Sequence, residues 1–561
     1  MKKALVLLLA LIMMVSLLAG CGGSKTEAPK TETKDETPKT EVKVDNATET
    51  EDSRDSAGTI DLGKTDETQE AVIANEVSIA VNTDIVIDPW NSWNVARQHM
   101  MPILYNTLAE YNKDSEYGMM GILMKEFKPL GDMTYEITIY DYIYDHAGNH
   151  LTADDVVFSF EGFKKAGKSV KTKIIEEVTK TGDYTVQVKL NTPGMGEIEG
   201  LLCNQVFIVS KAAYEASVDG MATQPVSTSP YKVTEFISGS SCTLEAVENH
   251  WQTDASLIPP GQATNAKKIN YVIVREASQV SINLEAGNID AAGVSGHEVT
   301  RFQEGGASSE GFTAITAKIP EFCFLHFNMA PGQGMFADSL EARQAIAYAI
   351  DVEGLIEGAF DGYGEPVYSF GCTTAIDFNQ DWHKEVYAYD AAKAKELVKS
   401  SGLGDKTIRL ICDNKENSKI LSQAIQAYLN AAGLEVEITM LESALLSTTA
   451  KDPTAWDLSL TSKTNHSYYS ELSNVWQTKT PSLNLTEDAE FDAIIEKVRN
   501  AATHDEYIDD YVNYINDNCY AYPLMTIYNN YVVKDGISGV YLSFKGYMMP
   551  NAFTYTAEIN K

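Results

Sequence analysis

Two tryptophans, Trp90 and Trp93, have the side chains best suited to holding a solute. They lie in the segment Asp88-Pro89-Trp90-Asn91-Ser92-Trp93, and Arg97 follows shortly after. Aromatic faces together with Arg97 can stack a sugar or another flat ligand, and an aromatic face can also hold a cation. The alternative is that both rings belong to the core, where aromatic side chains usually lie. The sequence leaves both interpretations open.

A glycine-rich stretch resembles a cofactor motif but lacks its context. Gly332-Gln333-Gly334-Met335-Phe336-Ala337 follows an apolar run and fits a dinucleotide-binding pattern. Such a turn must open a helix directly. Here the predicted helix cap comes later, at Asp338 or Ser339. We therefore expect no dinucleotide and no other cofactor.

The histidines show no metal or catalytic pattern. His297-Glu298 lacks the second histidine of the HExxH zinc motif, because residue 301 is Arg. His146 and His150 are four residues apart, but the Gly148-Asn149 pair between them indicates a turn. We find no metal-ligand set and no nucleophile–base pair, so the sequence predicts a protein that is not an enzyme.

The N-terminus predicts export. Lys2 and Lys3 precede an apolar run from residue 4 to residue 15, and the small residues Ala19 and Gly20 precede Cys21. The first features are those of a secretory signal peptide. The segment Leu17-Leu18-Ala19-Gly20-Cys21 resembles the lipobox of bacterial lipoproteins. This resemblance implies that residues 1–20 are removed and that Cys21 is lipidated, which holds the protein on the extracytoplasmic face of the cell membrane.

Composition limits the size of the folded units and the classes of partner. With 561 residues the chain is too long for one hydrophobic core, so at least two lobes are expected. The net charge of −35 argues against a nucleic-acid partner and against charge-driven binding to an anionic membrane. Lipid at Cys21 is therefore the expected membrane contact. The other six cysteines show no CxxC pair and predict neither a zinc site nor a specific disulfide.

A polar segment separates the proposed anchor from the globular part. Residues 21–70 are rich in Lys, Thr, Glu, Asp and Pro and contain few large apolar side chains. They bury too little surface to fold, so we expect a tether.

Beyond the tether, local patterns alternate between strands and helices. The segments 135–139 and 185–190 alternate as strands, and Thr152 with Asp155 forms a capping box for a helix. Asp338 with Glu341 predicts another helix cap, and Asp390 opens a further helix.

One later stretch predicts a parallel strand pair. Residues 407–412 read as a strand, 420–432 as a helix closed by Gly433, and 434–438 as a strand. A strand, a helix and a strand with short joins imply two parallel strands linked by a crossover.

A set of segments occurs in a fixed order along the chain: 135–139, His146-Ala147-Gly148, 151–159, Ser229-Pro230-Tyr231-Lys232, 248–251, 284–290, 342–351, 389–397 and 426–433. In this order they resemble one protein family, the extracellular solute-binding proteins of family 5, which serve ABC importers for oligopeptides, dipeptides and nickel.

The resemblance implies an α/β fold of the periplasmic-binding-protein type, with two lobes joined by a hinge. It corresponds to the type II form of the large cluster, in which one lobe carries an extra subdomain. The expected boundaries are lobe 1 over 71–318 with the subdomain over about 97–225, lobe 2 over 319–522, and a return to lobe 1 over 523–561.

The function implied is a substrate-binding lipoprotein that captures a peptide or peptide-like solute and delivers it to ABC permease and ATPase subunits. The implied partners include no nucleic acid, and we expect a monomer. Two alternatives stay open: a ligand-sensing receptor on the same fold, or a binder of a non-peptide solute such as an oligosaccharide or a metal chelate.

The chain departs from the peptide-binding members of the family in the loop after Trp456-Asp457-Leu458-Ser459-Leu460. There the family implies a Trp and an Asp that pairs with the peptide's amino end, whereas this chain has Asn465 or His466 near that place and Lys463 close by. An arginine before the helix at Gln426 is also absent. Ordinary short peptides are therefore in doubt. The further ligand-contact residues predicted in this region are Tyr468, Tyr469 and Trp476.

Overall fold

The computed structural model describes residues 58–59, 72–91, 100–112, 115–169, 171–191, 195–304, 307–333, 335–375, 377–465, 467–468, 487–499, 507–543 and 545–555. Two large sheets dominate these residues, and each has a hydrophobic core of its own. We call the seven-stranded sheet with its attached elements lobe 1, and the six-stranded sheet with its helices lobe 2. Within the described ranges, no helix is long and apolar enough to cross a membrane.

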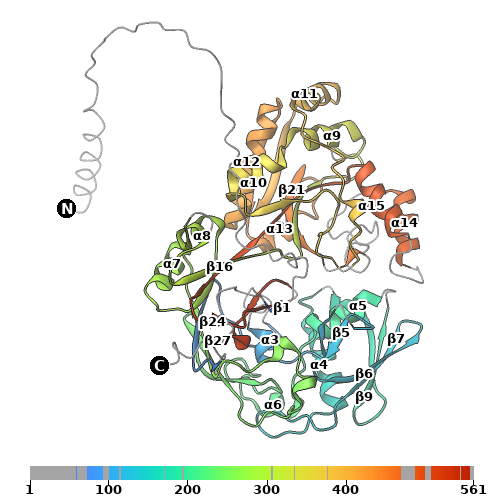
Figure 1. The fold of residues 1–561 in the computed structure, drawn as a ribbon. Coiled ribbons are helices and arrows are strands. Elements are labelled where there is room, and N and C mark those ends of the chain that lie inside the picture. Colours follow the sequence, from blue (N-terminus) through green and yellow to red (C-terminus); the bar gives the residue numbers. More distant parts are fainter. Residues whose placement is uncertain are drawn as a thin grey trace, which may run out of the picture. The chain divides into compact units, whose positions relative to one another are not determined.

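Lobe 1 is built on a mixed sheet with helices on one face (Figure 1). Its elements are β3 (Val77–Val81), β10 (Tyr231–Ile237), β11 (Ser241–Ala246), β12 (Lys268–Ile273), β13 (Ala291–Val294), β16 (Phe312–Ala317), β23 (Asn529–Lys534), α7 (Ala277–Glu285) and α8 (Gly296–Val299). The order is β10-β11-β12-β3-β13-β23-β16, and β3 pairs in parallel with both β12 and β13. Val280 of α7 and Val299 of α8 pack with Val532 of β23, which places both helices against the sheet.

A smaller antiparallel sheet forms the extra subdomain of lobe 1. It consists of β6 (Met124–Gly131), β7 (Thr134–Ile139), β9 (Thr185–Leu190) and β8 (Ile175–Lys180), in that order, with α4 (Ala153–Ala166) packed against it. The capping box predicted at the start of α4 is confirmed, because Thr152 and Asp155 exchange both hydrogen bonds. The two strands predicted from alternation, β7 and β9, are confirmed as well.

Short elements complete lobe 1, and its core includes residues from the end of the chain. They are β1 (Gly58–Thr59), β2 (Val72–Ile73), α3 (Met101–Leu104), β4 (Ala109–Tyr111), β5 (Met119–Gly121), α5 (Met195–Gly200), α6 (Lys211–Ala216), β14 (Gln303–Glu304), β15 (Ala307–Ser308), β24 (Ile537–Ser538), β25 (Tyr541–Leu542), β26 (Met548–Met549) and β27 (Thr554–Tyr555). β25 pairs with β1 and β27 pairs with β2. The C-terminal strands therefore join the beginning of the folded chain.

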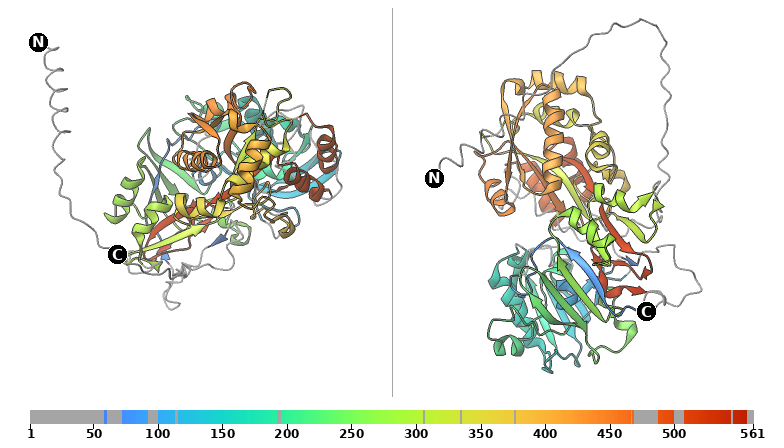
Figure 2. Two further views of the ribbon diagram at one scale, coloured as in Figure 1. Left: turned by 90° about the horizontal axis from the view of Figure 1, so that it is seen from above. Right: turned by 90° about the vertical axis from the view of Figure 1, so that its left-hand side faces the viewer.

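Lobe 2 carries most of the helices. Its sheet has the order β18 (Gly364–Pro366), β22 (Ala521–Ile527), β17 (Glu321–Phe327), β21 (Leu458–Thr464), β19 (Thr407–Asp413) and β20 (Glu435–Leu441). The helices are α9 (Leu340–Ala349), α10 (Val352–Phe360), α11 (Ala391–Ser400), α12 (Glu416–Ala431), α13 (Ser443–Thr449), α14 (Ala489–Arg499) and α15 (Ile508–Asp517). The long α12, orange in Figure 2, packs on β19 and β20.

The structure tests three predictions for lobe 2. The parallel pair is confirmed, because β19 and β20 run parallel with α12 between them in sequence. The helix α12 begins earlier than predicted, at Glu416. Of the two caps predicted for α9, Asp338 or Ser339, the structure has Ser339, which accepts the hydrogen bond from the N–H of Ala342; the Asp338–Glu341 capping pair is therefore wrong. Ser339 takes this role because it is one residue nearer to the first helical residue, Leu340.

Two strand connections pass between the large sheets. β16 in lobe 1 leads to β17 in lobe 2 through residues 318–320, and β22 in lobe 2 leads to β23 in lobe 1 through Tyr528 alone. Within each sheet these strands pair with each other: β16 with β23, and β17 with β22. We call residues 318–320 and Tyr528 the crossing.

Most of the described cysteines are buried. The six cysteines in the described part of the chain are free thiols, and Cys242, Cys372, Cys412 and Cys519 are buried. Burial raises the pKa of the Cys519 thiol to about 12, so it stays neutral at physiological pH.

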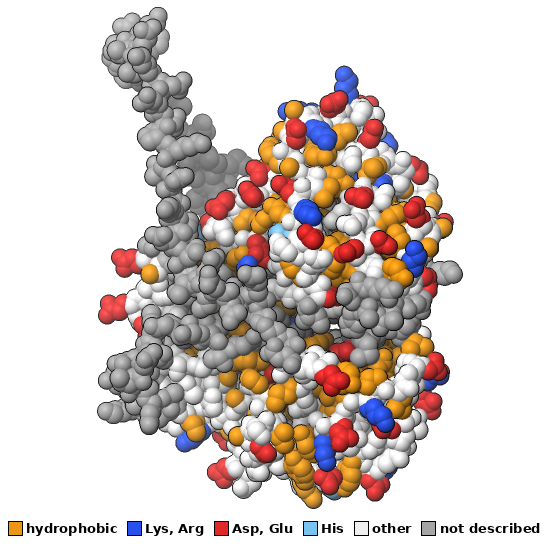
Figure 3. Space-filling view, turned by 45° about the vertical axis from the view of Figure 1, so that its right-hand side comes forward, with side chains coloured by type: hydrophobic (Ala, Val, Ile, Leu, Met, Phe, Trp, Pro, Cys, Tyr) orange, Lys and Arg blue, Asp and Glu red, His pale blue; other side chains and the backbone are white. Residues whose placement is uncertain are grey.

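Figure 3 shows Asp and Glu side chains scattered over the visible face, among hydrophobic and basic ones, rather than gathered in one patch.

Candidate solute-binding site

Three of the predicted ligand-contact residues lie in the described part of the chain: Trp90, Asn465 and Tyr468. Cys21, Trp93, Arg97, His466, Tyr469 and Trp476 lie outside it. Asn465 and Tyr468 belong to one segment of lobe 2, whereas Trp90 belongs to lobe 1.

The indole ring of Trp90 packs inside lobe 1. It makes edge contacts with Phe163, Tyr214 and Phe158, with ring centroids 5.0, 5.6 and 5.8 Å away. A Cβ atom at Gly162 would lie 2.4 Å from this ring, so α4 carries a glycine where the indole rests. This is the core role that the sequence left open. Contact of the partly buried ring with a ligand stays a prediction.

Asn465 stands at the point where lobe 2 meets the crossing. β21 extends to Thr464, four residues beyond the predicted strand end at Leu460, because it pairs with β17 along its whole length. Asn465 is therefore the first residue after the strand, and its backbone N–H donates to the carbonyl of Pro320 over 2.8 Å. Its side chain is fully buried.

The side-chain amide of Asn465 has a defined orientation. The backbone N–H of Cys372 donates to Oδ1 of Asn465 over 2.8 Å, which only the oxygen can accept. The Nδ2 group therefore points away from Cys372. Within the described residues this buried Nδ2 has no acceptor. The site thus offers a neutral hydrogen-bond donor where the family resemblance implies an acid.

Tyr468 closes the same segment from inside lobe 2. Its ring lies 4.7 Å from Trp382 and its hydroxyl lies 2.9 Å from the Ser369 hydroxyl. Asp377 accepts hydrogen bonds from the Tyr468 N–H over 2.7 Å and from the Ser467 hydroxyl over 2.9 Å. The tyrosine belongs to the core of lobe 2, so it supports the loop, and direct ligand contact stays a prediction.

A carboxylate on β18 ties both parts of the crossing together. Glu365 accepts from Lys318 over 2.7 Å, from the Thr373 hydroxyl over 2.7 Å and from the Tyr528 hydroxyl over 3.4 Å. Lys318 and Tyr528 each lie on one of the two connections. No local pattern marks Glu365, so sequence reasoning missed it. Only the fold brings these groups together.

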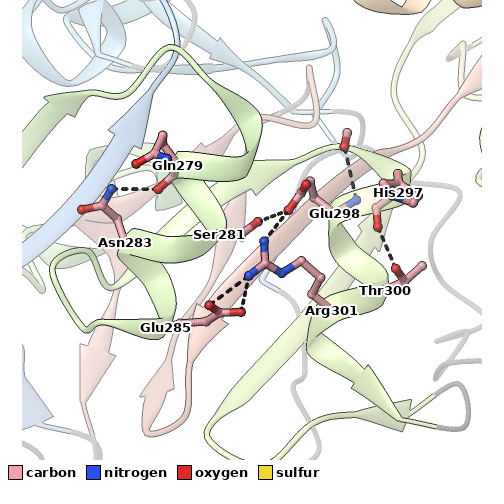
Figure 4. A network of polar contacts seen from close by, with 9 residues as sticks. Gln279, Ser281, Asn283, Glu285, His297, Glu298, Thr300 and Arg301 are labelled. Carbon is pink, nitrogen blue, oxygen red and sulfur yellow. Dashed lines mark hydrogen bonds and ion pairs between the residues drawn. The ribbon is translucent and has the colours of Figure 1, made fainter. Parts of the chain in front are cut away.

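A second polar network joins α7 and α8 in lobe 1 (Figure 4). Glu298 of α8 accepts from Ser281 of α7 over 2.5 Å and from Arg301 over 3.3 Å. Arg301 also binds both carboxylate oxygens of Glu285, at 2.8 and 3.0 Å. This ties α7 to α8.

Tyr363, which follows α10 of lobe 2, contacts lobe 1 beside α8. Its hydroxyl donates to Gln303 over 2.7 Å, its carbonyl accepts from the N–H of Tyr528 over 3.2 Å, and its ring packs on the core between α7 and α8. A Cβ atom at Gly296 would lie 3.0 Å from the ring. The contact is therefore close and lies next to the crossing.

The motifs set aside from the sequence have structural roles. Glu298 is engaged by Ser281 and Arg301 as described. The Nε2 atom of His146 forms a hydrogen bond with the carbonyl of Ser229 over 2.8 Å, and that of His150 with the carbonyl of Asp141 over 2.9 Å. Among the residues that the structure describes, no group of three metal-ligating side chains occurs.

Arg343 of α9 also has a structural role. It donates to the carbonyls of Phe336 over 2.6 Å and Asn518 over 3.0 Å. Both of these oxygens are neutral. An arginine can use carbonyls because its planar fork presents five donors.

A site of this kind can hold a ligand through hydrogen bonds. It combines two α/β lobes, a pair of short strand connections and a buried amide beside them, which defines the class of two-lobe solute-binding proteins. A sequence model of the bacterial extracellular solute-binding proteins, family 5 (middle part), matches residues 123–482. The chain belongs to this family, whose members work outside the cytoplasm.

Individual relatives are distant. The glutathione-binding protein GsiB of Pectobacterium atrosepticum is 22% identical over 378 residues, which cover 66% of this chain and 70% of the relative. The oligopeptide-binding protein AppA of Bacillus subtilis, solved with a nonapeptide, has a TM-score of 0.69 at 18% identity and covers 87% of this chain and 100% of its own. NikA of Staphylococcus aureus, solved with Ni(L-His)2, has a TM-score of 0.66 at 17% identity, covering 86% of this chain and all of its own. The two structures confirm the fold.

Proposed function

We propose that this chain captures a peptide or peptide-like solute outside the cell and delivers it to the permease of an ABC importer. Membership of family 5 supports solute capture, and the names of GsiB and AppA support the peptide-like class. The observation that carries the proposal is the buried amide of Asn465 beside Pro320 of the crossing.

The chemistry of this amide limits what it can receive. A buried donor without an acceptor costs about 1–3 kcal/mol, and a ligand oxygen would remove that cost. A peptide carbonyl or a carboxylate is therefore the complementary group. An ammonium group has donors only and would meet a donor here. The amino end of a peptide is thus not the part that Asn465 receives.

The crossing supplies the conformational element that such a receptor needs. A ligand that contacts both lobes stabilises the closed state over the open one. Closure about a few connecting residues is a general property of two-lobe binding proteins. We assign the hinge to residues 318–320 and Tyr528, lobe 1 to 71–317 with its subdomain and the returning segment 529–561, and lobe 2 to 321–527. The boundary expected between residues 522 and 523 moves to Tyr528, because β22 pairs within the sheet of lobe 2.

Cell location and partners complete the proposal. The lipid on Cys21 anchors the mature chain, and the expected tether over residues 21–70 joins the lobes to the outer face of the cytoplasmic membrane. The free part of this tether ends before β1 (Gly58–Thr59), because β1 pairs with β25 of lobe 1. The chain acts as a monomer with permease and ATPase subunits of the importer. It returns the solute chemically unchanged, since the role needs no catalytic group.

The test is to identify what the protein carries. The protein is purified without added ligand, denatured, and the released small molecules are analysed by mass spectrometry. A peptide or amide-containing solute at near-stoichiometric amount is expected, and Asn465→Ala should lower its amount at least tenfold while Asn417→Ala, on the exposed side of α12, should not. A carried sugar or metal chelate without amide or carboxylate groups would contradict the peptide-like class.

A further inference from the structure

A small cavity lies in the wall of lobe 1, away from Asn465. Its volume is about 60 Å³, and its lining includes Glu110 of β4, Tyr541 of β25, Gly261, Phe207, Asn204 and Lys545. This is room for a few water molecules or the end of a slim side chain. Apolar side chains form most of the wall, and Glu110 is the acidic group among the lining residues.

Both hydrogen-bond donors to the Glu110 carboxylate bind its Oε1, which leaves Oε2 for a ligand. The Tyr541 hydroxyl donates to Oε1 over 3.0 Å, and the N–H of Gly261 donates to the same oxygen over 3.4 Å. Neither partner is a cation, and the structure records no ion pair to Glu110 within the described residues. Burial raises the pKa of Glu110 to about 7. Acids withdrawn from water are normally paired with a cation, so a pocket that holds one without such a partner is suited to a cationic ligand.

The other polar groups of the cavity do not fill this role. Lys545 donates to Oδ1 of Asn204 over 3.0 Å. Burial raises the pKa of the Cys203 thiol and that of the Tyr541 hydroxyl well above their usual values, so both stay neutral. Among the lining residues, Glu110 is therefore the group that carries a negative charge once it ionises.

A turn that contributes Lys545 to the cavity wall also contacts the crossing. A Cβ atom at Gly546, next to Lys545, would lie 2.5 Å from Cγ2 of Ile319, and the Tyr531 hydroxyl donates to the carbonyl of Gly546 over 2.5 Å. The turn that carries Lys545 is thus packed on the first connection between the lobes. Pro320 follows Ile319 in that same connection, and its carbonyl accepts from the N–H of Asn465. A solute bound at Asn465 would therefore lie near this connection.

We propose that Glu110 binds a primary ammonium group of the solute. The inference rests on the proposed function and adds the cation that Asn465 cannot receive. An ammonium is a compact point charge that one oxygen can hold, whereas a guanidinium binds best through both oxygens of a carboxylate. Since Oε1 is already occupied by Tyr541 and Gly261, the geometry favours the ammonium group.

The test uses n-butylammonium chloride as the probe and calorimetry with the full-length protein at pH 8. Saturable binding is expected to wild type, at least tenfold weaker binding to Glu110→Gln, and no loss with Glu116→Gln, which removes an exposed acid outside the cavity. The amide introduced by Glu110→Gln keeps an acceptor oxygen for Tyr541 and Gly261, and a melting temperature close to that of wild type at pH 4.5, where the acid is protonated in the folded protein, verifies folding. n-Butanol and n-butylguanidinium should bind at least tenfold more weakly than the ammonium probe.

Equal affinity of wild type and Glu110→Gln for n-butylammonium, or no binding to wild type, would overturn the assignment. A protein that carries a peptide-like solute but fails this test would refute the ammonium site alone. A protein that binds the probe at Glu110 but carries a solute without amide or carboxylate groups would refute the proposed function alone.

Discussion

The N–H of Cys372 donates to Oδ1 of Asn465 over 2.8 Å, across 93 residues of sequence. This hydrogen bond fixes the orientation of the Asn465 amide. Its Oδ1 already accepts from Cys372, and its Nδ2 remains as a donor beside the crossing. Removing the amide takes this hydrogen bond from the N–H of Cys372 and leaves a small cavity, but it also removes the unpaired Nδ2 donor. We therefore expect Asn465→Ala to give a net fall in the free energy of unfolding of under about 3 kcal/mol, measured by urea denaturation of the ligand-free protein.

The matched substitution Asn417→Ala gives the reference for that measurement. Asn417 is exposed on α12, where alanine is the better helix former, so its change should be neutral or slightly stabilising. Equal losses in the two variants would mean that the Cys372–Asn465 bond contributes nothing to stability.

The ion pair at the crossing should be stronger than one on the open surface. Lys318 and Glu365 lie 2.7 Å apart with side chains 29% and 18% exposed, whereas Lys268 and Glu76 lie 3.3 Å apart with 36% and 53% exposed. Double-mutant cycles with Lys→Met and Glu→Gln should give a coupling of about 1 kcal/mol or more at the crossing and under about 0.5 kcal/mol at the surface pair. If the coupling at the crossing is no stronger than that of the surface pair, Glu365 does not hold the two connections together.

Glu110 should make stability depend on pH. Its pKa rises from an ordinary 4.5 to about 7 on folding, so between these values the folded state holds a proton that the unfolded state has lost. Stability from this group therefore falls as pH rises from about 4.5 to about 7 and then stays low. Glu110→Gln removes that loss and should stabilise the protein at pH 8 by up to about 2–3 kcal/mol, with little effect at pH 4.5.

Thermal unfolding of wild type, Glu110→Gln and Glu116→Gln across this pH range checks the prediction. The difference between Glu110→Gln and wild type should grow with pH, and Glu116→Gln should follow wild type. A difference that is constant with pH would mean that Glu110 keeps an ordinary pKa.

The anchor can be separated from the binding lobes. Cys21→Ser should release the protein from membranes and leave solute binding unchanged, because the lipid would sit at the far end of the tether over residues 21–70. Cell fractionation after a high-salt wash is the measurement. A mature Cys21→Ser protein that stays in the membrane fraction would show that the anchor is not lipid.

Local patterns predicted the elements of the fold better than the contacts of the site. The capping box of Thr152 and Asp155 and the alternation in β7 are properties of a few neighbouring residues, so they can be recognised in the sequence. The family resemblance led to Asn465. Its acceptor and donor geometry depends on Cys372 and Pro320, which lie far away along the chain and meet it only through the sheet.

The remaining site residues carried no recognisable signal. Glu110 is one acid in a chain with 79 Asp and Glu residues, and only the cavity distinguishes it. Glu365 likewise gains its role from strand topology. Tyr468 illustrates the opposite case: an aromatic residue near the expected ligand suggests a contact residue, yet its ring completes the core of lobe 2.

The central claim is that this protein binds a solute between its lobes and leaves it unchanged. The most direct measurement adds the solute recovered from the purified protein back to ligand-free protein, follows unfolding, and then analyses the solute. At about 100 times the dissociation constant the account predicts a stabilisation of about 2.7 kcal/mol and full recovery of the intact solute. Steady conversion of the solute, or no stabilisation at saturating concentration, would contradict it.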